Sequence, residues 1–488
     1  MRLKNNIIKK LHIKYRDLSP AAKAGIWFTI CGFAQRGLSF ITTPIFTRIM
    51  TTQQYGVVSV YNSWEQVLLI LCSLNLFYGG FNNGMRDYKN QRNMYVSTVQ
   101  GLITIITAIW FVVYLAGQRF WNQVLEMDTY LVVILFIQIV AQSSLLLWSG
   151  KERFEFKYKS LVAITFANTA FGAILPIFTI LLSNKDNAAE VKIITHACVV
   201  ILFGGGLYIY NLLKGKKFFE RRIWKDAFQF NLPLLPHYLS TMILNQADRI
   251  MISKMVGSSE AGIYSVAYSA SMILNILVTS INNAFAPWIY EKLDSNSFKD
   301  IKKVANTMFA GIALILMLLI AFAPECIELF AGAKYSDAVK IIPSVATSLY
   351  FIFMYQIFAN VEFYFKKNKF ITYASVTGAV LNIILNYIGI QLFGYIAAGY
   401  TTLICYIVFG VSHYIFMRKI CKENLNDTRL FDSKTIFSIA IGLIAFAIVM
   451  TILYEHILIR YGILVGIVII IILNREKIIQ QYRILKKK

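Results

Sequence analysis

The sequence predicts an all-α polytopic membrane protein with about 14 transmembrane helices, in two six-helix lobes around a central lumen plus two C-terminal helices. Three observations lead to this prediction: a series of apolar stretches, positive charge in alternate gaps between them, and an internal repeat with an offset of about 200 residues. The composition agrees, because 57% of the 488 residues are hydrophobic and only 15% are charged. Such a chain leaves no room for a sizeable soluble domain.

Fourteen stretches between Ala24 and Leu473 are candidates for membrane spans. A helix needs about 20 mainly apolar residues to cross the hydrocarbon core, and the last stretch is the shortest. The predicted spans cover 24–45, 56–78, 96–116, 129–148, 160–182, 193–212, 230–253, 261–286, 304–323, 341–363, 371–392, 396–416, 435–453 and 461–473.

The basic residues predict the orientation. With the N-terminus in the cytoplasm, 38 of the 48 Lys and Arg residues fall on the inner side and 9 on the outer side, while Arg36 lies within the first span. Basic residues collect on the cytoplasmic side of membrane proteins, so both termini are predicted to be cytoplasmic. This topology and anionic membrane lipid account for the net charge of +23, and no nucleic-acid motif accompanies it.

An internal repeat divides the chain. Thr47–Met50 matches Asp248–Met251, Tyr55–Ser63 matches Ala261–Ser269, and the pair Asn82 and Asn83 matches Asn282 and Asn283. Parallel repeats of this kind build transporters in which two lobes alternate in access. The predicted parts are a cytoplasmic amphipathic N-terminus (1–23), an N-lobe with spans 1–6 (24–212), a cytoplasmic linker (213–229), a C-lobe with spans 7–12 (230–416), a cytoplasmic loop (417–434), spans 13 and 14 (435–473) and a cytoplasmic tail (474–488).

Several of these residues together resemble the Wzx-type polysaccharide flippases of the multidrug/oligosaccharidyl-lipid/polysaccharide (MOP) exporter superfamily. They are Arg36, the segment from Thr47 to Gly56, Pro233–His237, and the segment from Asp248 to Ser265. The resemblance implies translocation of undecaprenyl-pyrophosphate-linked oligosaccharide repeats across the bacterial cytoplasmic (inner) membrane, for O-antigen of lipopolysaccharide, for capsule or for a related polymer. It also implies membrane lipids and other polysaccharide-assembly membrane proteins as partners, and no nucleic acid.

Arg36 is the sharpest single candidate for contact with such a substrate. A cation in mid-span costs about 2.5–3.5 kcal/mol on insertion scales and usually faces a cavity or a partner, and a guanidinium can hold a phosphate with two hydrogen bonds. The alternatives are an ion pair with Glu65 in the second span and a side chain that extends along the helix to the membrane interface. The full set of predicted substrate-binding residues is Arg36, Arg48, Arg249, Glu65, His237, Asn82, Asn83, Asn282 and Asn283.

Arg48 and Arg249 occupy equivalent places in the repeat, near the outer ends of spans 1 and 7. They either attract the pyrophosphate or anchor the helices at the membrane surface. Pro233 and Pro236 should bend or interrupt span 7 at its inner start, beside His237.

A cation-coupling site is predicted at Asp248, Asn382, Asn386 and Thr402. Asn382 and Asn386 are four residues apart and share one helix face, and carboxylate, amide and hydroxyl oxygens are ligands that sodium accepts. The alternative is a local arrangement of Asp248 with Arg249 plus ordinary interhelical hydrogen bonds. Coupling to Na⁺ or H⁺ is expected, with no organic cofactor, and the six scattered cysteines show no metal-ligand spacing.

No catalytic signature is found, so the chain is not expected to be an enzyme. It has no phosphate-binding glycine loop with its lysine, no GxSxG motif and no long outer loop that could carry paired carboxylates. The competing functions are an ion-coupled multidrug exporter, a flippase for lipid II or a teichoic precursor, and a membrane polysaccharide polymerase. Cationic drugs would call for acidic spans, whereas only Glu65 and Asp248 lie in mid-span.

Overall fold

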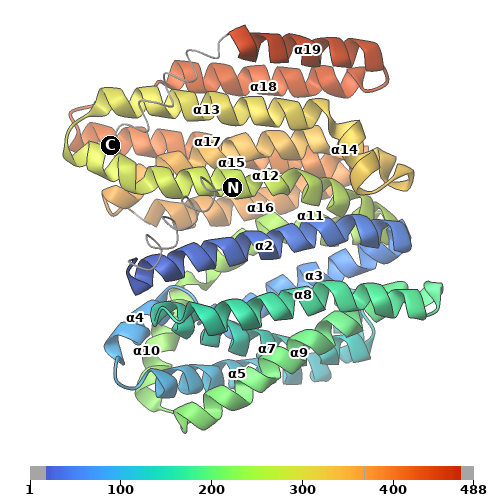
Figure 1. Cartoon of the computed structure of the whole chain (residues 1–488), viewed down its shortest axis with the longest axis vertical. Coiled ribbons are helices and arrows are strands. Elements are labelled where there is room, and N and C mark those ends of the chain that lie inside the picture. Colours follow the sequence, from blue (N-terminus) through green and yellow to red (C-terminus); the bar gives the residue numbers. More distant parts are fainter. Residues whose placement is uncertain (1–17, 368, 474–488) are drawn as a thin grey trace, which may run out of the picture. The chain divides into compact units, whose positions relative to one another are not determined.

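The computed structural model describes residues 18–367 and 369–473, and these residues form helices joined by short turns without a strand. The predicted all-α fold is therefore confirmed (Figure 1). Most of the amphipathic N-terminus expected at 1–23, and the whole tail 474–488, lie outside the described residues. The chain divides into two compact units. The first takes in the described residues up to Met50 and Tyr61–Leu239, and the second takes in Thr51–Val60 and the described residues from Ser240 onward.

The first unit contains nine α-helices from α2 to α10, of which α3 begins in the second unit. Within it α2 packs on α8, α8 on α9, and α9 on both α5 and α7. The elements are α2 (Pro20–Ile49), α3 (Thr52–Ser73), α4 (Gly80–Asp87), α5 (Arg92–Ala116), α6 (Gln118–Leu125), α7 (Thr129–Phe154), α8 (Tyr158–Leu182), η1 (Lys185–Asn187), α9 (Ala188–Gly215), α10 (Arg221–Asn231) and η2 (Leu232–Leu234).

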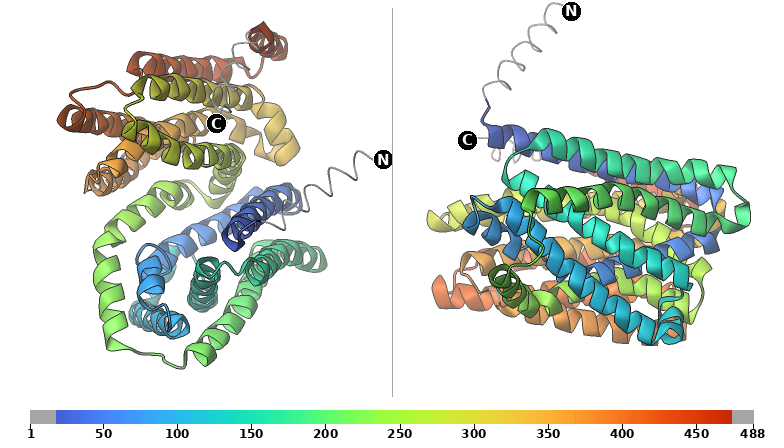
Figure 2. Two further views of the ribbon diagram at one scale, coloured as in Figure 1. Left: turned by 60° about the vertical axis from the view of Figure 1, so that its left-hand side comes forward. Right: turned by 90° about the horizontal axis from the view of Figure 1, so that it is seen from below.

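The second unit is centred on α15, which is almost entirely buried and packs against α12, α13, α17 and α18. The last two helices, α18 and α19, lie side by side and both contact α13 (Figures 1 and 2). The elements are α11 (Leu235–Met255), α12 (Ser258–Asp294), α13 (Phe298–Ala321), α14 (Ala323–Phe330), η3 (Ala333–Lys340), α15 (Ile342–Tyr364), α16 (Lys369–Phe393), α17 (Ala397–Asn424), α18 (Ser433–Leu453) and α19 (Ile457–Leu473).

Ten helices in the described part of the chain are long and apolar enough to cross a membrane, so the protein is a multi-pass membrane protein. Four of the fourteen predicted spans fall on helices outside these ten, namely 24–45 on α2, 56–78 on α3, 230–253 on α11 and 461–473 on α19. The last has only 17 residues. The other three are long enough but carry polar side chains such as Arg36, Glu65 and Asp248. Membrane helices keep ionisable groups mainly where these face protein or water, so functional groups are expected on α2, α3 and α11.

Two predicted span boundaries are wrong. The second span ends at Ser73 instead of 78, because Leu74 and Asn75 adopt positive φ angles of 47° and 53°, which end a helix. Asn82 and Asn83 therefore lie on the separate helix α4. The seventh span starts at Leu235 instead of 230.

Prolines set the start of the seventh span. Pro233 lies in the 3₁₀ turn η2, which separates α10 from α11, and Pro236 lies in the first turn of α11. Proline lacks the N–H that an α-helix interior requires and is tolerated in the first turn. The interruption predicted from these prolines is confirmed.

The start of α3 crosses the start of α12 at two glycines, within the second unit. A methyl group on Gly56 would lie 1.6 Å from the carbonyl oxygen of Ser258, and one on Gly262 would lie 2.2 Å from that of Thr52. The hydroxyls of Thr52 and Ser259 are 2.8 Å apart at the same crossing. Since Gly56 and Gly262 are equivalent in the internal repeat, the two repeated segments meet at matching residues.

Substitution of Gly56 by Ala should lower the thermal unfolding midpoint of the purified protein. The added methyl group meets backbone rather than a movable side chain, and overpacking of this kind costs about 1–3 kcal/mol. Gly205 in α9 is the matched control, because nothing lies within 4 Å of a methyl group there. Gly205→Ala should be neutral or stabilising, since glycine in a helix interior costs roughly 0.5–1 kcal/mol relative to alanine. Equal midpoints for Gly56→Ala and the wild type would contradict the close crossing.

Candidate functional site

The structure brings the four residues of the predicted cation site together, from three helices of the second unit. Asp248 comes from α11, Asn382 and Asn386 from α16, and Thr402 from α17. The Asp248 side chain is fully buried and accepts hydrogen bonds from Asn386 Nδ2 at 2.6 Å and from Thr402 Oγ1 at 2.9 Å. Asn382 completes the ring, with contacts of 3.2 Å to both Asn386 and Thr402.

Two further hydroxyls enter the same cluster. Tyr264 of α12 donates to Asp248 Oδ2, and Thr401 of α17 donates to Asn386 Oδ1. Thr401 stands out in the sequence as a neighbour of Thr402, whereas the role of Tyr264 was not predicted, although it lies in the repeated segment Ala261–Ser269. We call these six residues the Asp248 cluster: Asp248, Tyr264, Asn382, Asn386, Thr401 and Thr402.

The oxygen atoms of the Asp248 cluster are of the kinds that ligate a small hard cation, because such ions take carboxylate, amide and hydroxyl oxygens. Here the carboxylate is surrounded by three protein donors, which compensate its charge away from water. Asp248, Asn382 and Thr402 would hold the cation through their oxygens. The described residues contain no group of three or more His, Cys, Asp and Glu side chains that could hold a metal ion.

Arg249 forms no direct ion pair with Asp248 among the described residues. It is buried, donates to the carbonyl oxygen of Asn245 at 2.6 Å and to Gln246 at 3.1 Å, and lies 4.2 Å from the centre of the Tyr268 ring. Such a cation–π contact stabilises a desolvated guanidinium.

Arg48 makes an equivalent contact in α2, where it is exposed. It donates to the carbonyl oxygen of Pro44 at 2.9 Å, again four residues earlier. The repeat therefore preserves the local geometry of both arginines.

Arg36 and Glu65 are not paired. Arg36 is exposed on α2 and has no hydrogen bond or ion pair in the described part of the chain. Glu65 on α3 is buried and accepts from Gln138 Nε2 at 2.8 Å, while Gln138 Oε1 accepts from the Tyr61 hydroxyl at 2.9 Å. The ion-pair alternative for Arg36 is therefore not what the structure contains. Two glutamines, Gln138 and Gln142, interrupt the apolar span 129–148, and the structure shows that Gln138 is the partner of Glu65.

The predicted asparagine pairs lie in different settings. Asn282 and Asn283 belong to the long continuous helix α12, where Asn282 accepts a hydrogen bond from Asn360 at 2.9 Å. Asn82 and Asn83 are exposed on the short helix α4. His237 is partly buried in the first turn of α11, with its ring 5.9 Å from that of Tyr238.

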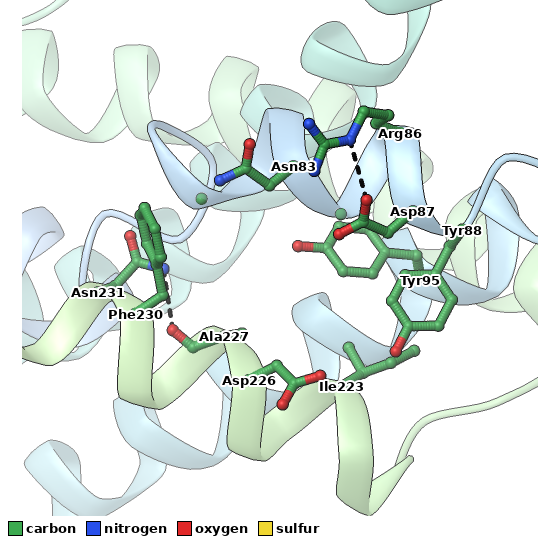
Figure 3. Close-up of a pocket in the computed structure, with 12 residues that line it drawn as sticks. Asn83, Arg86, Asp87, Tyr88, Tyr95, Ile223, Asp226, Ala227, Phe230 and Asn231 are labelled. Carbon is green, nitrogen blue, oxygen red and sulfur yellow. Dashed lines mark hydrogen bonds and ion pairs between the residues drawn. The ribbon is translucent and has the colours of Figure 1, made fainter.

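Asn83 lines a cavity of about 280 Å³ within the first unit, between α4, α5 and α10 (Figure 3). Asn82 is not among the lining residues. The wall consists of Gly80, Asn83, Gly84, Arg86, Asp87, Tyr88, Tyr95, Ile223, Asp226, Ala227, Phe230 and Asn231. Burial raises the pKa of the Tyr88 phenol, so its hydroxyl stays protonated at neutral pH and can donate a hydrogen bond.

A second buried polar pair in the second unit was missed. Glu362 of α15 and His413 of α17 are fully buried, with 2.8 Å between Oε1 and Nδ1. Their other polar atoms, Oε2 and Nε2, have no partner in the described part of the chain. The sequence signal was one carboxylate and one imidazole within otherwise apolar spans, but nothing in their spacing shows that they meet.

Comparisons with known proteins extend this description. The model of the polysaccharide biosynthesis protein family matches residues 21–292, and the MatE model matches residues 233–388. The Haemophilus influenzae protein "Lsg locus putative protein 1" is 22% identical over 377 residues, which is 74% of this chain and 88% of that protein.

Two solved structures share the fold. The lipid II flippase MurJ, in an inward closed conformation, has a TM-score of 0.64 at 17% identity and covers 93% of this chain and 100% of its own. An inward-facing multidrug resistance MATE family transporter of the MOP superfamily has a TM-score of 0.57 at 14% identity, with 82% and 98% covered.

The family matches agree with the resemblance to polysaccharide exporters that the sequence motifs indicated, and the two solved structures show that their fold is shared by this chain. The family match at 21–292 includes Arg36, Glu65, the cavity between α4 and α10, and Asp248. It covers more than half of the chain, and so the chain belongs to the polysaccharide biosynthesis protein family.

Proposed function

We propose that this protein is a flippase that translocates undecaprenyl-pyrophosphate-linked oligosaccharide repeat units across the bacterial cytoplasmic membrane by alternating access. The polymer built from these units would be O-antigen, capsule or a related surface polysaccharide. The membership of the polysaccharide biosynthesis protein family and the relative from the Lsg locus support this substrate class. Membrane lipids and other polysaccharide-assembly membrane proteins are the expected partners.

The observation that carries the proposal is the unpaired guanidinium of Arg36 on a long helix of the first unit. A cation within a span is costly to insert, so one that has no internal partner is expected to serve a function. A pyrophosphate is the charged group of the proposed substrate, and its two phosphates match the planar donors of arginine. Arg48 and Arg249 would add to the positive potential along the route.

Energy coupling is proposed at the Asp248 cluster. A cation held there would supply positive charge to the buried carboxylate, and its binding would replace hydrogen bonds that Asp248 now accepts from α12, α16 and α17. Because these donors come from three helices, occupancy by Na⁺ or H⁺ would change the hydrogen bonds that connect those helices to α11. Such a change is what couples an ion gradient to a conformational equilibrium.

A flippase for lipid II is the second candidate, since the similar solved structure named above is a lipid II flippase. Both substrates share a polyprenyl pyrophosphate, and Arg36 would serve either. A multidrug exporter is less favoured by the residues, because a route for cationic drugs would not carry an unpaired arginine.

The experiment that tests the proposal is depletion of the protein followed by analysis of the polyprenyl-linked intermediates. Complete oligosaccharide repeat units should accumulate, and they should be accessible to modifying reagents only from the cytoplasmic side. Accumulation of lipid II in their place would select the second candidate. Unchanged intermediates together with drug hypersensitivity would select the exporter.

A further inference from the structure

The cavity between α4, α5 and α10 has a chemistry different from that of Arg36 and the Asp248 cluster. Its lining residues come from 80–95 and 223–231 of the first unit, which lie in or next to two segments predicted to be cytoplasmic. The proposed substrate is assembled on that side of the membrane, so a ligand could enter this cavity before translocation.

Two glycines on one face of α4 let aromatic rings form the walls. A methyl group on Gly80 would lie 2.7 Å from the ring of Phe230, and one on Gly84 would lie 2.0 Å from the ring of Tyr95. Tyr95 is held in turn by the rings of Phe81 and Tyr88, at centroid distances of 5.8 and 5.4 Å. The aromatic walls are therefore fixed by packing.

Helix α10, which carries the opposite wall, is also anchored. Trp224 donates its indole N–H to the carbonyl oxygen of Thr98 on α5 at 2.8 Å. Ser97 of α5 donates to the carbonyl oxygen of Lys217, in the segment that leads into α10, at 2.7 Å. The cavity is thus enclosed by elements that are fixed to each other.

The polar groups of the cavity leave acceptors free. Asp87 is paired with Arg86 at 3.0 Å, whereas Asp226 on the opposite wall has no hydrogen bond or ion pair within the described residues (Figure 3). Asn231 is only 1% exposed, and its Nδ2 donates a hydrogen bond to the carbonyl oxygen of Ala227. Its Oδ1 has no partner in the described part of the chain. A buried and unsatisfied polar atom is costly, so the position of this amide favours a ligand that donates a hydrogen bond.

We propose that this cavity binds one sugar ring of the oligosaccharide. The sugar hydroxyls would donate hydrogen bonds to the Asp226 carboxylate and to the amide oxygens of Asn83 and Asn231, and the sugar ring would stack on the aromatic wall. The inference rests on the proposed function, because it assigns to the cavity the sugar portion of the same substrate. Carboxylate and amide oxygens accept from vicinal hydroxyls, and the ring of Phe230, which lines the cavity and is exposed, offers a flat apolar face.

Charge and volume restrict the ligand. After Arg86 and Asp87 compensate each other, Asp226 is the one charged side chain of the lining without an ion pair among the described residues, and a carboxylate accepts from a hydroxyl but not from a phosphate oxygen. Pockets for drug-sized ligands have volumes of about 300–1,000 Å³, so a cavity of about 280 Å³ suits a single ring rather than a whole repeat unit. The pyrophosphate and the sugar would therefore be recognised in different places.

The test is binding of methyl glycosides to the purified full-length protein, measured by saturation-transfer NMR with a panel of hexose and N-acetylhexosamine glycosides. At least one glycoside should bind at millimolar concentrations, and inorganic pyrophosphate should not compete with it. Asp226→Asn and Asn83→Ala should each weaken binding about tenfold, which corresponds to about 1.4 kcal/mol. Both residues are exposed, so the variants should unfold at the wild-type temperature.

Glu220→Gln is the matched control, because this carboxylate sits at the start of α10 but pairs with Lys217 outside the cavity. It should leave glycoside binding unchanged. Absence of binding by every glycoside, or binding that Asp226→Asn leaves intact, would overturn the sugar site. Either result would leave the proposed function intact if depletion still causes repeat units to accumulate. If instead a glycoside binds in an Asp226-dependent way but depletion causes no accumulation, the function is refuted and the sugar site remains.

Discussion

Replacement of Arg36 by alanine should leave the protein inserted and abundant in the membrane but reduce polymer export at least about a hundredfold. The side chain has no partner in the described structure, so its removal breaks no packing or ion pair. A hydrogen bond to a charged group contributes about 1.5–3 kcal/mol, and a guanidinium forms two of them with one phosphate. Export in a deletion strain complemented with each variant, together with immunodetection of the membrane fraction, is the measurement.

Arg36→Lys should restore export only in part, because an ammonium supplies the charge without the planar pair of donors. Arg119→Ala provides the matched control, since Arg119 is an exposed arginine of the same unit, on the short helix α6, and is not among the predicted substrate residues. It should export normally.

The double variant Arg36→Ala, Glu65→Gln separates a substrate role from a scaffold role. If an ion pair between the two were the whole function of Arg36, removal of both charges should restore activity. The structure instead places Glu65 against Gln138 at 2.8 Å, so we expect the double variant to be stable and still inactive. A fully active double variant would show that Arg36 has a structural role and does not contact the substrate.

Much of the fold could be predicted from the sequence, because burial in lipid requires long apolar helices whose residues are adjacent in the chain. The boundaries at Ser73 and Leu235 were harder. A break after Ser73 depends on left-handed backbone at Leu74 and Asn75. Asparagine adopts this conformation more readily than most residues, but leucine does not, and a single asparagine in an apolar run was not enough to place the helix end.

The candidate sites were predictable to different degrees for a physical reason. The Asp248 cluster could be anticipated because Asn382 and Asn386 share one face of α16, and because the Asn386 amide and the Thr402 hydroxyl are donors of the kind that a buried carboxylate needs. The contact between Glu362 and His413 could not, since Glu362 is the one carboxylate of α15 and His413 the one imidazole of α17, and no repeat or spacing relates them. Which residues face each other is then set by the rotation of α15 against α17, and that rotation depends on packing rather than on local sequence.

The cavity between α4 and α10 was hidden for a related reason. Asn83 is visible in the sequence as one of a pair of asparagines, but Asp226 and Asn231 lie more than 100 residues away. Asp226 is in the predicted cytoplasmic linker (213–229), and Asn231 is at the predicted start of span 7 (230–253). The glycines at positions 80 and 84 allow the rings of Phe230 and Tyr95 to approach α4 closely, and this contact can be recognised only in the structure. Sequence periodicity gives the face of each short helix but not its partner.

Replacement of Asp248 by asparagine should abolish the response of transport to a sodium gradient while the protein still folds. The substitution keeps the size of the side chain and removes the negative charge that a cation requires. Asn386 donates to Oδ1 of Asp248, and Thr402 and Tyr264 donate to Oδ2, so the new N–H₂ group faces either the Asn386 amide or the two hydroxyls. Two of these three donors are hydroxyls, which can rotate to accept, so the loss in folding free energy should stay within about 1–3 kcal/mol.

The measurement is sodium-dependent thermal protection of the purified protein, followed by transport in vesicles with and without an inward sodium gradient. Glu362→Gln is the matched control, since it removes another fully buried carboxylate of the second unit that lies outside the Asp248 cluster, and it should keep the sodium response. Tyr264→Phe should keep the response as well, because the carboxylate and its charge remain. A wild-type protein indifferent to sodium would exclude a sodium site, and Asp248 would then have to act through a proton. In that case transport should follow the pH gradient and still fail in Asp248→Asn, since an amide cannot take up and release the proton that a carboxylate carries.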